Sequence, residues 1–169
     1  EVLKTVRLGI ECGRLPEDTG TDVPAILGKF GLLKDGVLNN AAAVLFGKHE
    51  DMEYPQCLLR LARFKGTDKT VFMDSQRIQG NFFQLLNAAM AFIFKHLSLS
   101  GTTDTLEREE HLTIPYKAIR EGVLNSLTHR SYKEAGGSVG IAIYDDRVEI
   151  ENPGTFPPDW NAEKMRSEH

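Results

Sequence analysis

Hydrophobic and polar positions alternate along two separate parts of the chain, and this alternation predicts two β-hairpins. Residues 57–64 and 70–78 form the arms of the first, and residues 138–144 and 147–151, joined by an Asp-Asp turn, form the second. Successive side chains of a strand point to opposite faces of a sheet, so each arm offers one apolar face to a core. The pattern therefore predicts a sheet built largely from antiparallel pairs.

Three other segments have the apolar spacing of helices. Residues 80–97 are apolar around almost the whole helix, which favours a position in the core over a subunit contact. Residues 115–130 form a second long helix, with a proline in the first turn, where its missing N–H would have no helical partner. A shorter helix begins at Asp22, whose side chain can cap it, and Gly28 and Gly31 keep it short.

The remaining segments give weaker signals. Residues 1–20 have little clear periodicity, and residues 41–46 are compatible with a buried strand or with the end of a helix. Residues 98–111 are polar and predict a loop, and residues 155–169 predict a polar, frayed end. Together the segments predict an α+β protein in which helices pack on a mixed, largely antiparallel sheet.

Composition restricts the function to a few broad classes. Of the 169 residues, 41% are hydrophobic, which is enough for a core, and the net charge of −4 differs from the basic excess of a whole-domain nucleic-acid binder. Cys12 and Cys57 lack the spacing of metal ligands, and the apolar run 82–97 is interrupted by polar residues. We therefore expect a cytoplasmic protein with reduced thiols, no membrane span and only local contact, if any, with DNA.

The helix at 115–130 carries the strongest candidate chemistry. Glu121 and Asn125 are four residues apart, so they lie one turn apart on one face. Spacing alone favours a solvated polar row opposite an apolar face. The alternative is a nucleotide site, in which Glu121 orients or deprotonates a water and the Asn125 amide oxygen binds Mg²⁺.

Longer motifs support the nucleotide alternative. Residues 114–132 read IPYKAIREGVLNSLTHRSY, and residues 143–154 read IYDDRVEIENPG. Both resemble motifs of the RecG-like transcriptional regulators of bacteria, Schlafen- or Alba-type DNA-binding proteins with a divergent GHKL-ATPase-like C-terminal region. Residues 40–47 and 61–66 resemble the middle segment of the same family, so the resemblance covers most of the chain. It implies that the chain is an internal fragment of such a protein.

The resemblance also implies roles for particular residues. In GHKL ATPases, such as gyrase B, histidine kinases and MutL, one helix carries a Glu that acts as general base and an Asn that binds Mg²⁺; Glu121 and Asn125 fall on these places. Asn152 and Gly154 fall on the turn beside the adenine, where Asn152 replaces an acid. Ser131 stands where the RecG-like family commonly has an Asp after His-Arg. The Gly-rich segment over the phosphates would lie beyond residue 169. We therefore expect ATP and Mg²⁺ in the full-length protein and no tight binding by the fragment.

The same resemblance divides the chain near residue 110. Residues 1–20 would be the tail of an upstream DNA-binding domain or a linker, residues 21–110 a middle α+β domain, and residues 111–169 the first part of a truncated GHKL-like α/β sandwich. DNA would bind through the missing upstream domain, and the chain would form a homodimer in one of the two interpretations. The chain has no P-loop, so the activity implied is weak ATP hydrolysis by the full-length protein and not a helicase motor.

Basic side chains gather around the end of the first hairpin arm. Arg60, Arg63, Lys65 and Lys69 are either part of a solvated strand edge or a strip that contacts phosphate or DNA. Arg130 would pair with a glutamate of the last hairpin or with a phosphate. A rival interpretation gives the helix at 115–130 and the last hairpin a non-catalytic role in dimerisation or interaction, without nucleotide binding. Both interpretations stay open at this point.

Overall fold

The computed structural model describes most of the chain. It describes residues 1–48, 54–97, 99–102, 109–112, 114–133, 136–154 and 164, with the backbone alone for 99–102 and 109–112. The polar end expected at 155–169 therefore lies outside the described residues, apart from Lys164.

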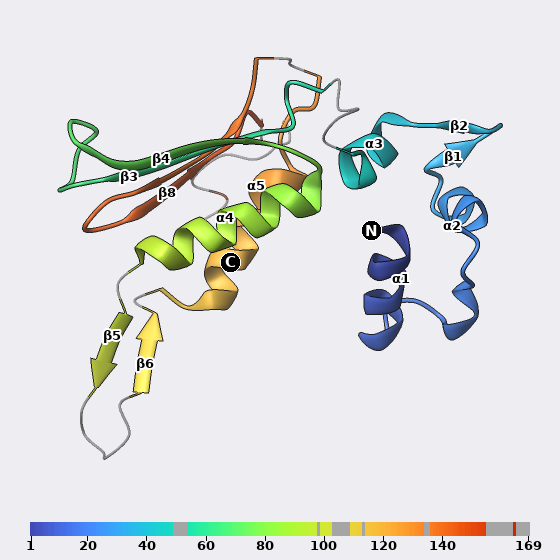
Figure 1. Cartoon of the computed structure of the whole chain (residues 1–169), viewed down its shortest axis with the longest axis horizontal. Coiled ribbons are helices and arrows are strands. Elements are labelled where there is room, and N and C mark those ends of the chain that lie inside the picture. Colours follow the sequence, from blue (N-terminus) through green and yellow to red (C-terminus); the bar gives the residue numbers. More distant parts are fainter. Residues whose placement is uncertain are drawn as a thin grey trace.

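A four-stranded sheet is the centre of the described fold (Figure 1). Its order is β4-β3-β7-β8, in which β3–β4 and β7–β8 are antiparallel hairpins and β3–β7 is a parallel pair. The bounds are β3 (Leu58–Phe64), β4 (Phe72–Gln79), β7 (Val139–Ile143) and β8 (Val148–Glu151). Both predicted hairpins and the predicted α+β class with a mixed, largely antiparallel sheet are confirmed.

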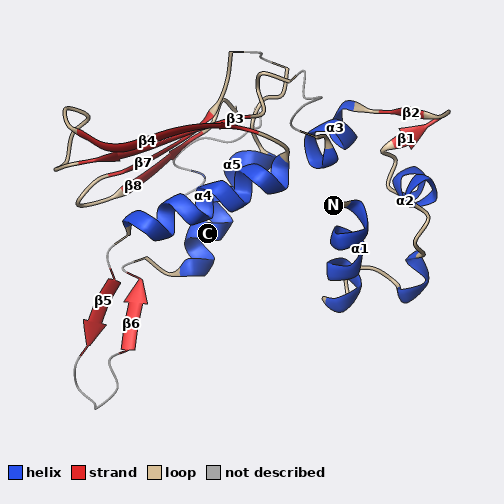
Figure 2. Cartoon of the chain, viewed as in Figure 1, coloured by secondary structure: helices blue, strands red, loops and turns tan. Residues whose placement is uncertain are grey.

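The main core lies between this sheet and the helices α4 (Phe82–His96) and α5 (Tyr116–Thr128), which cover one of its faces (Figure 2). Alternate residues of β3 and β7 face the helices and are at most 2% exposed: Leu59, Leu61, Val139, Ile141 and Ile143. They meet buried helix residues, namely Leu85, Leu86, Ala89, Phe92, Ile93, Ile119, Val123 and Leu127. The core position predicted for the segment 80–97 is confirmed.

The start of α4 is fixed by a reciprocal cap. The Asn81 side chain accepts a hydrogen bond from the Gln84 N–H (3.0 Å), and the Gln84 side chain accepts one from the Asn81 N–H (2.9 Å). This capping box satisfies two N–H groups that the helix cannot satisfy itself. The Asn81 amide also donates to the Gly47 carbonyl (2.9 Å), which ties α4 to the end of α3 (Asn40–Phe46).

The first part of the chain forms a separate small layer. Leu27, Leu32 and Ala42 make a second buried cluster there. Its elements are α1 (Val2–Glu11), the short 3₁₀ helix Glu17–Thr19, α2 (Val23–Lys29), β1 (Leu33–Lys34), β2 (Val37–Leu38) and α3. Asp22 caps α2 as predicted, accepting from the Ala25 N–H. The apolar run at 41–46 is helical, so the helix alternative is confirmed.

Two segments differ from the sequence-based expectation. Residues 2–11 form the helix α1, where little periodicity was expected, although Val2, Val6 and Ile10 follow the four-residue spacing of one helix face. The loop predicted for 98–111 is wrong, since β5 (Leu99–Thr102) and β6 (Glu109–Leu112) pair as an antiparallel hairpin. This hairpin projects away from α4 and α5 (Figure 1), so it needs no apolar alternation to form.

The parallel pair β3–β7 joins strands from before and after residue 110, near which the family resemblance implied a domain boundary. Register pairs run from Leu59 with Val139 to Arg63 with Ile143. The main core therefore contains residues from both sides of that point.

Arg63 and Asp145 join the two hairpins at one end of the sheet. The Arg63 guanidinium donates to the Asp145 carboxylate and to the carbonyls of Phe64 and Ile143. The other Asp145 oxygen accepts from the Gly66 N–H (2.7 Å). The Arg63 hydrogen bond, and then the Gly66 N–H, lower the pKa of Asp145 below its ordinary value of 3.8.

This pair predicts a pH-dependent contribution to stability. Because the folded pKa of Asp145 is lowered, its contribution is complete above pH 3.8 and disappears as the pH falls through the folded pKa. We expect Asp145→Asn to lower the urea midpoint at pH 7, with a difference from wild type that shrinks in acid. Asp146→Asn is the matched control, since that carboxylate pairs with Arg147 on its own turn. A constant difference from pH 7 to pH 2 would contradict the assignment.

Candidate functional site

The polar row of α5 lies on the solvent side of the helix. Glu121 and Asn125 are both exposed, while Ile119, Val123 and Leu127 on the other side are at most 5% exposed. The amphipathic helix is thus as the spacing predicts. Neither Glu121 nor Asn125 lines any of three cavities formed by described residues: one over β3, β4 and β7, one around Arg63 and Tyr144, and one between α3 and the end of α5.

The turn at 152–154 packs against the C-terminal end of α5. The Ser131 N–H donates to the Pro153 carbonyl (2.8 Å), and the Gly154 N–H donates to the Asn152 carbonyl (2.9 Å). A Cβ at Gly154 would lie 2.5 Å from the His129 carbonyl oxygen, so only glycine fits this approach. The structure thus brings Asn152 and Gly154 to the end of α5, whereas Glu121 lies about two turns earlier.

Arg130 is buried beside this turn, with an exposed fraction of 5%. One terminal nitrogen donates to the Gly137 carbonyl (2.7 Å), and the guanidinium carbon lies 4.9 Å from the centre of the Tyr132 ring. Its Nε and other terminal nitrogen are buried without a hydrogen bond. Among the described residues, Glu149 and Glu151 pair with Arg147 and Lys69 instead, so the glutamate partner considered for Arg130 is not found.

Burial is the largest cause of the pKa shifts around Arg130. Desolvation lowers the pKa of its guanidinium and raises the pKa of the Tyr132 hydroxyl to about 12. Burial also raises the pKa of the Cys57 thiol, against a smaller opposite effect of Arg130. The Gln56 amide donates to the Tyr132 carbonyl (2.9 Å), but its oxygen has no hydrogen-bond partner. These groups make a tightly packed polar cluster rather than an open site.

The basic residues at the end of β3 do not form one strip. Arg63 is engaged by Asp145 and by backbone carbonyls, as described above. Arg60 points to the opposite face of the sheet and is exposed, and Lys65 is exposed in the turn after β3. Lys69 lies 3.9 Å from Glu151. Alternation along β3 explains the separation, because Arg60 and Arg63 are an odd number of residues apart.

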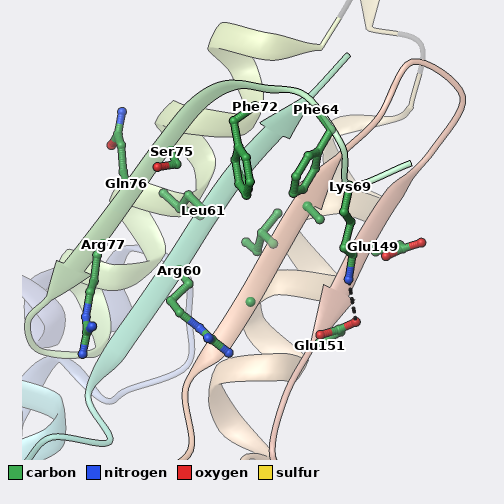
Figure 3. A pocket seen from close by; sticks show the side chains of 14 residues that line it. Arg60, Leu61, Phe64, Lys69, Phe72, Ser75, Gln76, Arg77, Glu149 and Glu151 are labelled. Atoms are coloured by element: carbon green, nitrogen blue, oxygen red, sulfur yellow. Dashed lines mark ion pairs between the residues drawn. The ribbon is translucent and has the colours of Figure 1, made fainter. Parts of the chain in front are cut away.

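A cavity of about 390 Å³ on that opposite face was not anticipated (Figure 3). It lies over β3, β4 and β7 and is lined by side chains that include Arg60, Phe64, Phe72 and Arg77. The alternation of 57–64 places Arg60 and Phe64 on one face, but the pairing with β4 brings in Arg77 and Phe72. The sequence alone therefore predicts that Arg60 and Phe64 share a face, but not that Arg77 and Phe72 lie beside them.

A bound Mg²⁺ would need more donors than this part of the chain provides. Glu121 and Asn125 supply two oxygen-bearing side chains of the type that Mg²⁺ accepts. The described residues contain no group of three or more His, Cys, Asp and Glu that could hold a metal. Phosphate oxygens, water or further protein groups would have to complete the coordination.

Comparison with known proteins supports the C-terminal resemblance in part. Residues 136–169 match the family model described as "Putative ATP-dependent DNA helicase recG C-terminal". The matched region contains β7, β8, Asn152 and Gly154, but not Glu121 or Asn125. No curated protein matches the chain. Among the described residues, no helix is long and apolar enough to cross a membrane.

One solved structure has a similar fold. The DIP2311 protein from Corynebacterium diphtheriae superposes with a TM-score of 0.73 at 17% sequence identity. The similarity covers 96% of this chain and 32% of that protein. The chain therefore has the fold of about a third of this longer protein, and it carries at residues 136–169 a region like the RecG C-terminal family.

The close approach at Gly154 generates a prediction. Gly154→Ala should lower the free energy of unfolding by about 1–3 kcal/mol, because the new methyl group must displace the His129 carbonyl. Urea unfolding followed by circular dichroism measures this change. Gly136→Ala is the matched control, since a Cβ there meets nothing within 4 Å. Equal midpoints for the two variants would show that the 152–154 turn is not packed on α5.

Proposed function

We propose that this chain contributes an ATP-binding region to a DNA-associated bacterial regulator. The observation that carries the proposal is the match of residues 136–169 to the RecG C-terminal family, in a segment that packs on the end of α5. The motifs in α5 and in the last hairpin resemble those of GHKL ATPases, and the fold brings both into contact. DNA binding would be the task of a domain outside this chain.

In this proposal, the exposed row of α5 forms the catalytic side of the nucleotide site. Glu121 would orient and deprotonate a water, and the Asn125 amide oxygen would bind Mg²⁺. The two side chains lie one turn, about 5–6 Å, apart along one face, which is a suitable separation for a water beside a metal ion. Asn152 and Gly154 would contact the adenine.

A non-catalytic interaction module is the second candidate. It is favoured by one specific observation: Glu121 and Asn125 are exposed and border none of the three cavities described above. In this case the exposed polar row of α5 would contact another protein surface, and ATP would have no effect on it.

Titration calorimetry with ATP and Mg²⁺ separates the two candidates. It should be carried out on this chain and on a version extended beyond His169. We expect binding by the extended version, and loss of at least 100-fold in turnover with retained binding for Glu121→Ala, since a general base contributes about 10²–10⁴-fold. Asn125→Ala should weaken the Mg²⁺-dependent part of ATP binding.

The control is Lys117→Ala, which removes an exposed side chain from the same helix outside the proposed pair. It should leave both binding and turnover unchanged. Absence of ATP binding by both versions would exclude the nucleotide proposal and leave the interaction module.

A further inference from the structure

The face of the sheet that the helices leave uncovered, here called the open face, carries its side chains in three rows. Residues that are register partners on neighbouring strands make up the first two rows, and in the third row Tyr144 joins the partners Phe64 and Phe72 through its ring contact with Phe64. The first row is Arg77, Arg60, Gly140 and Glu151; the second is Ser75, Ala62, Ala142 and Glu149; the third is Phe72, Phe64 and Tyr144. Arg60 and Arg77 therefore lie at one end of the open face, and Phe64 and Phe72 lie at the other (Figure 3).

The aromatic end is a preformed cluster of three rings. The Phe64 ring stacks on Tyr144 at a centroid distance of 5.2 Å, and Phe72 is tilted by 48° against Phe64 at 4.5 Å. The Arg147 guanidinium lies 3.9 Å from the centre of the Tyr144 ring. Phe64 is 3% exposed and Phe72 is 62% exposed, so Phe72 is the ring of this cluster that is open to a further flat group.

The centre of the open face is hollow because its residues are small. Ala62, Gly140 and Ala142 form the floor of the 390 Å³ cavity. Lys69, from the loop between β3 and β4, reaches over the β8 side to within 3.9 Å of Glu151 (Figure 3). The cavity is at the lower end of the usual size for small-molecule sites, about 300–1,000 Å³.

The cationic end is not compensated within the described part of the chain. Arg60 and Arg77 are direct partners in the antiparallel register, a position in which like charges destabilise a sheet. Neither guanidinium forms a hydrogen bond or ion pair there. The nearby carboxylates are already paired, Glu149 with Arg147 at 2.7 Å and Glu151 with Lys69. The open face therefore holds two positive charges that an anionic ligand would neutralise.

We infer that this cavity binds a phosphate monoester joined to a flat heteroaromatic ring, the chemistry of a nucleoside 5′-monophosphate. A phosphate monoester carries a charge of about −1.5 to −2 at pH 7, which matches the two guanidinium groups of Arg60 and Arg77. The ring stacks on the exposed face of Phe72. The site lies across the sheet from α5, so it is separate from the ATP site proposed above and does not depend on it.

The distance between the two ends of the open face sets the length that the ligand spans. The first and third rows are four residues apart along β3, about 13 Å. The ligand has two sources with the same chemistry, a free nucleotide or the 5′-phosphorylated end of a single strand, and each gives a separate arm of the test.

Titration calorimetry of the whole chain with AMP, adenosine and inorganic phosphate tests the inference. We expect AMP to bind at least tenfold more tightly than either adenosine or phosphate, since each of these contacts one end of the cavity. Arg77→Glu and Phe72→Ala should each weaken AMP binding by about tenfold or more. Gly140→Leu should abolish it, because a side chain there fills the cavity without a clash: a Cβ meets nothing closer than 3.9 Å.

Matched controls separate this site from the rest of the molecule. Arg14→Glu makes the same charge change on an exposed arginine of the N-terminal layer and should leave AMP affinity unchanged. The AMP titration uses this chain alone, whereas the ATP proposal is tested on the version extended beyond His169, so failure of the ATP proposal and failure of this one are distinguishable. Far-UV circular dichroism verifies that the Arg77→Glu and Gly140→Leu variants remain folded.

A 5′-phosphorylated oligonucleotide and its 5′-hydroxyl form complete the experiment. Tighter binding of the phosphorylated strand than of AMP would support the strand end as the source, and AMP binding alone would support the free nucleotide. The inference is overturned if neither ligand binds, or if folded Arg77→Glu binds AMP as tightly as wild type. Equal affinity for AMP and adenosine would also overturn it.

Discussion

The parallel pairing of β3 with β7 is the interaction on which the rest of the fold depends. It joins a strand at 58–64 to one at 139–143, across a connection that contains both α4 and α5. Closing so long a loop costs about 4 kcal/mol in chain entropy. Each Val, Leu or Ile side chain buried on the two strands contributes about 1.5–3 kcal/mol. The five that face the helices outweigh the closure cost, so burial under α4 and α5 holds this pair together.

The same pairing decides what each face of the sheet can do. One face is covered by α4 and α5, whose apolar residues form the main core with it. The other receives Arg60, Ala62 and Phe64 from β3 and small residues from β7, so it is shallow, charged at one end and aromatic at the other. The exposed row of α5 lies on the far side of the helix layer. The molecule thus offers two chemically different surfaces with no residue in common.

Local patterns were sufficient to predict the elements that alternate or repeat strongly. Both hairpins, α4 and α5 follow from alternation, helical spacing and the Asp-Asp turn. The helix α1 was missed although Val2, Val6 and Ile10 lie on one helix face, so its pattern was present in the sequence. The hairpin β5–β6 projects away from the helices α4 and α5 and lies in a segment without apolar alternation.

The arrangement of candidate site residues was predictable only where the residues lie on one helix or one strand. Glu121 and Asn125 share a helix face, so their separation could be derived, but their exposure depends on what covers α5. The Arg60–Arg77 pair requires the register of β3 with β4, and a shift between Arg63 and Phe64 places Phe64 opposite Phe72. Long-range register of this kind is set by the packed sheet and not by either strand alone.

The C-terminal end of α5 is linked to both ends of the β7–β8 hairpin. Arg130 is buried with two nitrogens unpaired, and an unsatisfied buried donor costs about 1–3 kcal/mol or more when charged. Other contacts of the Arg130 side chain have to offset this free-energy cost. Here its bond to Gly137 and its contact with Tyr132 hold the entry to β7 against the helix, and the Ser131–Pro153 bond holds the exit of β8. A shift of α5 would therefore move both ends of the β7–β8 hairpin, and with it the floor of the cavity on the open face.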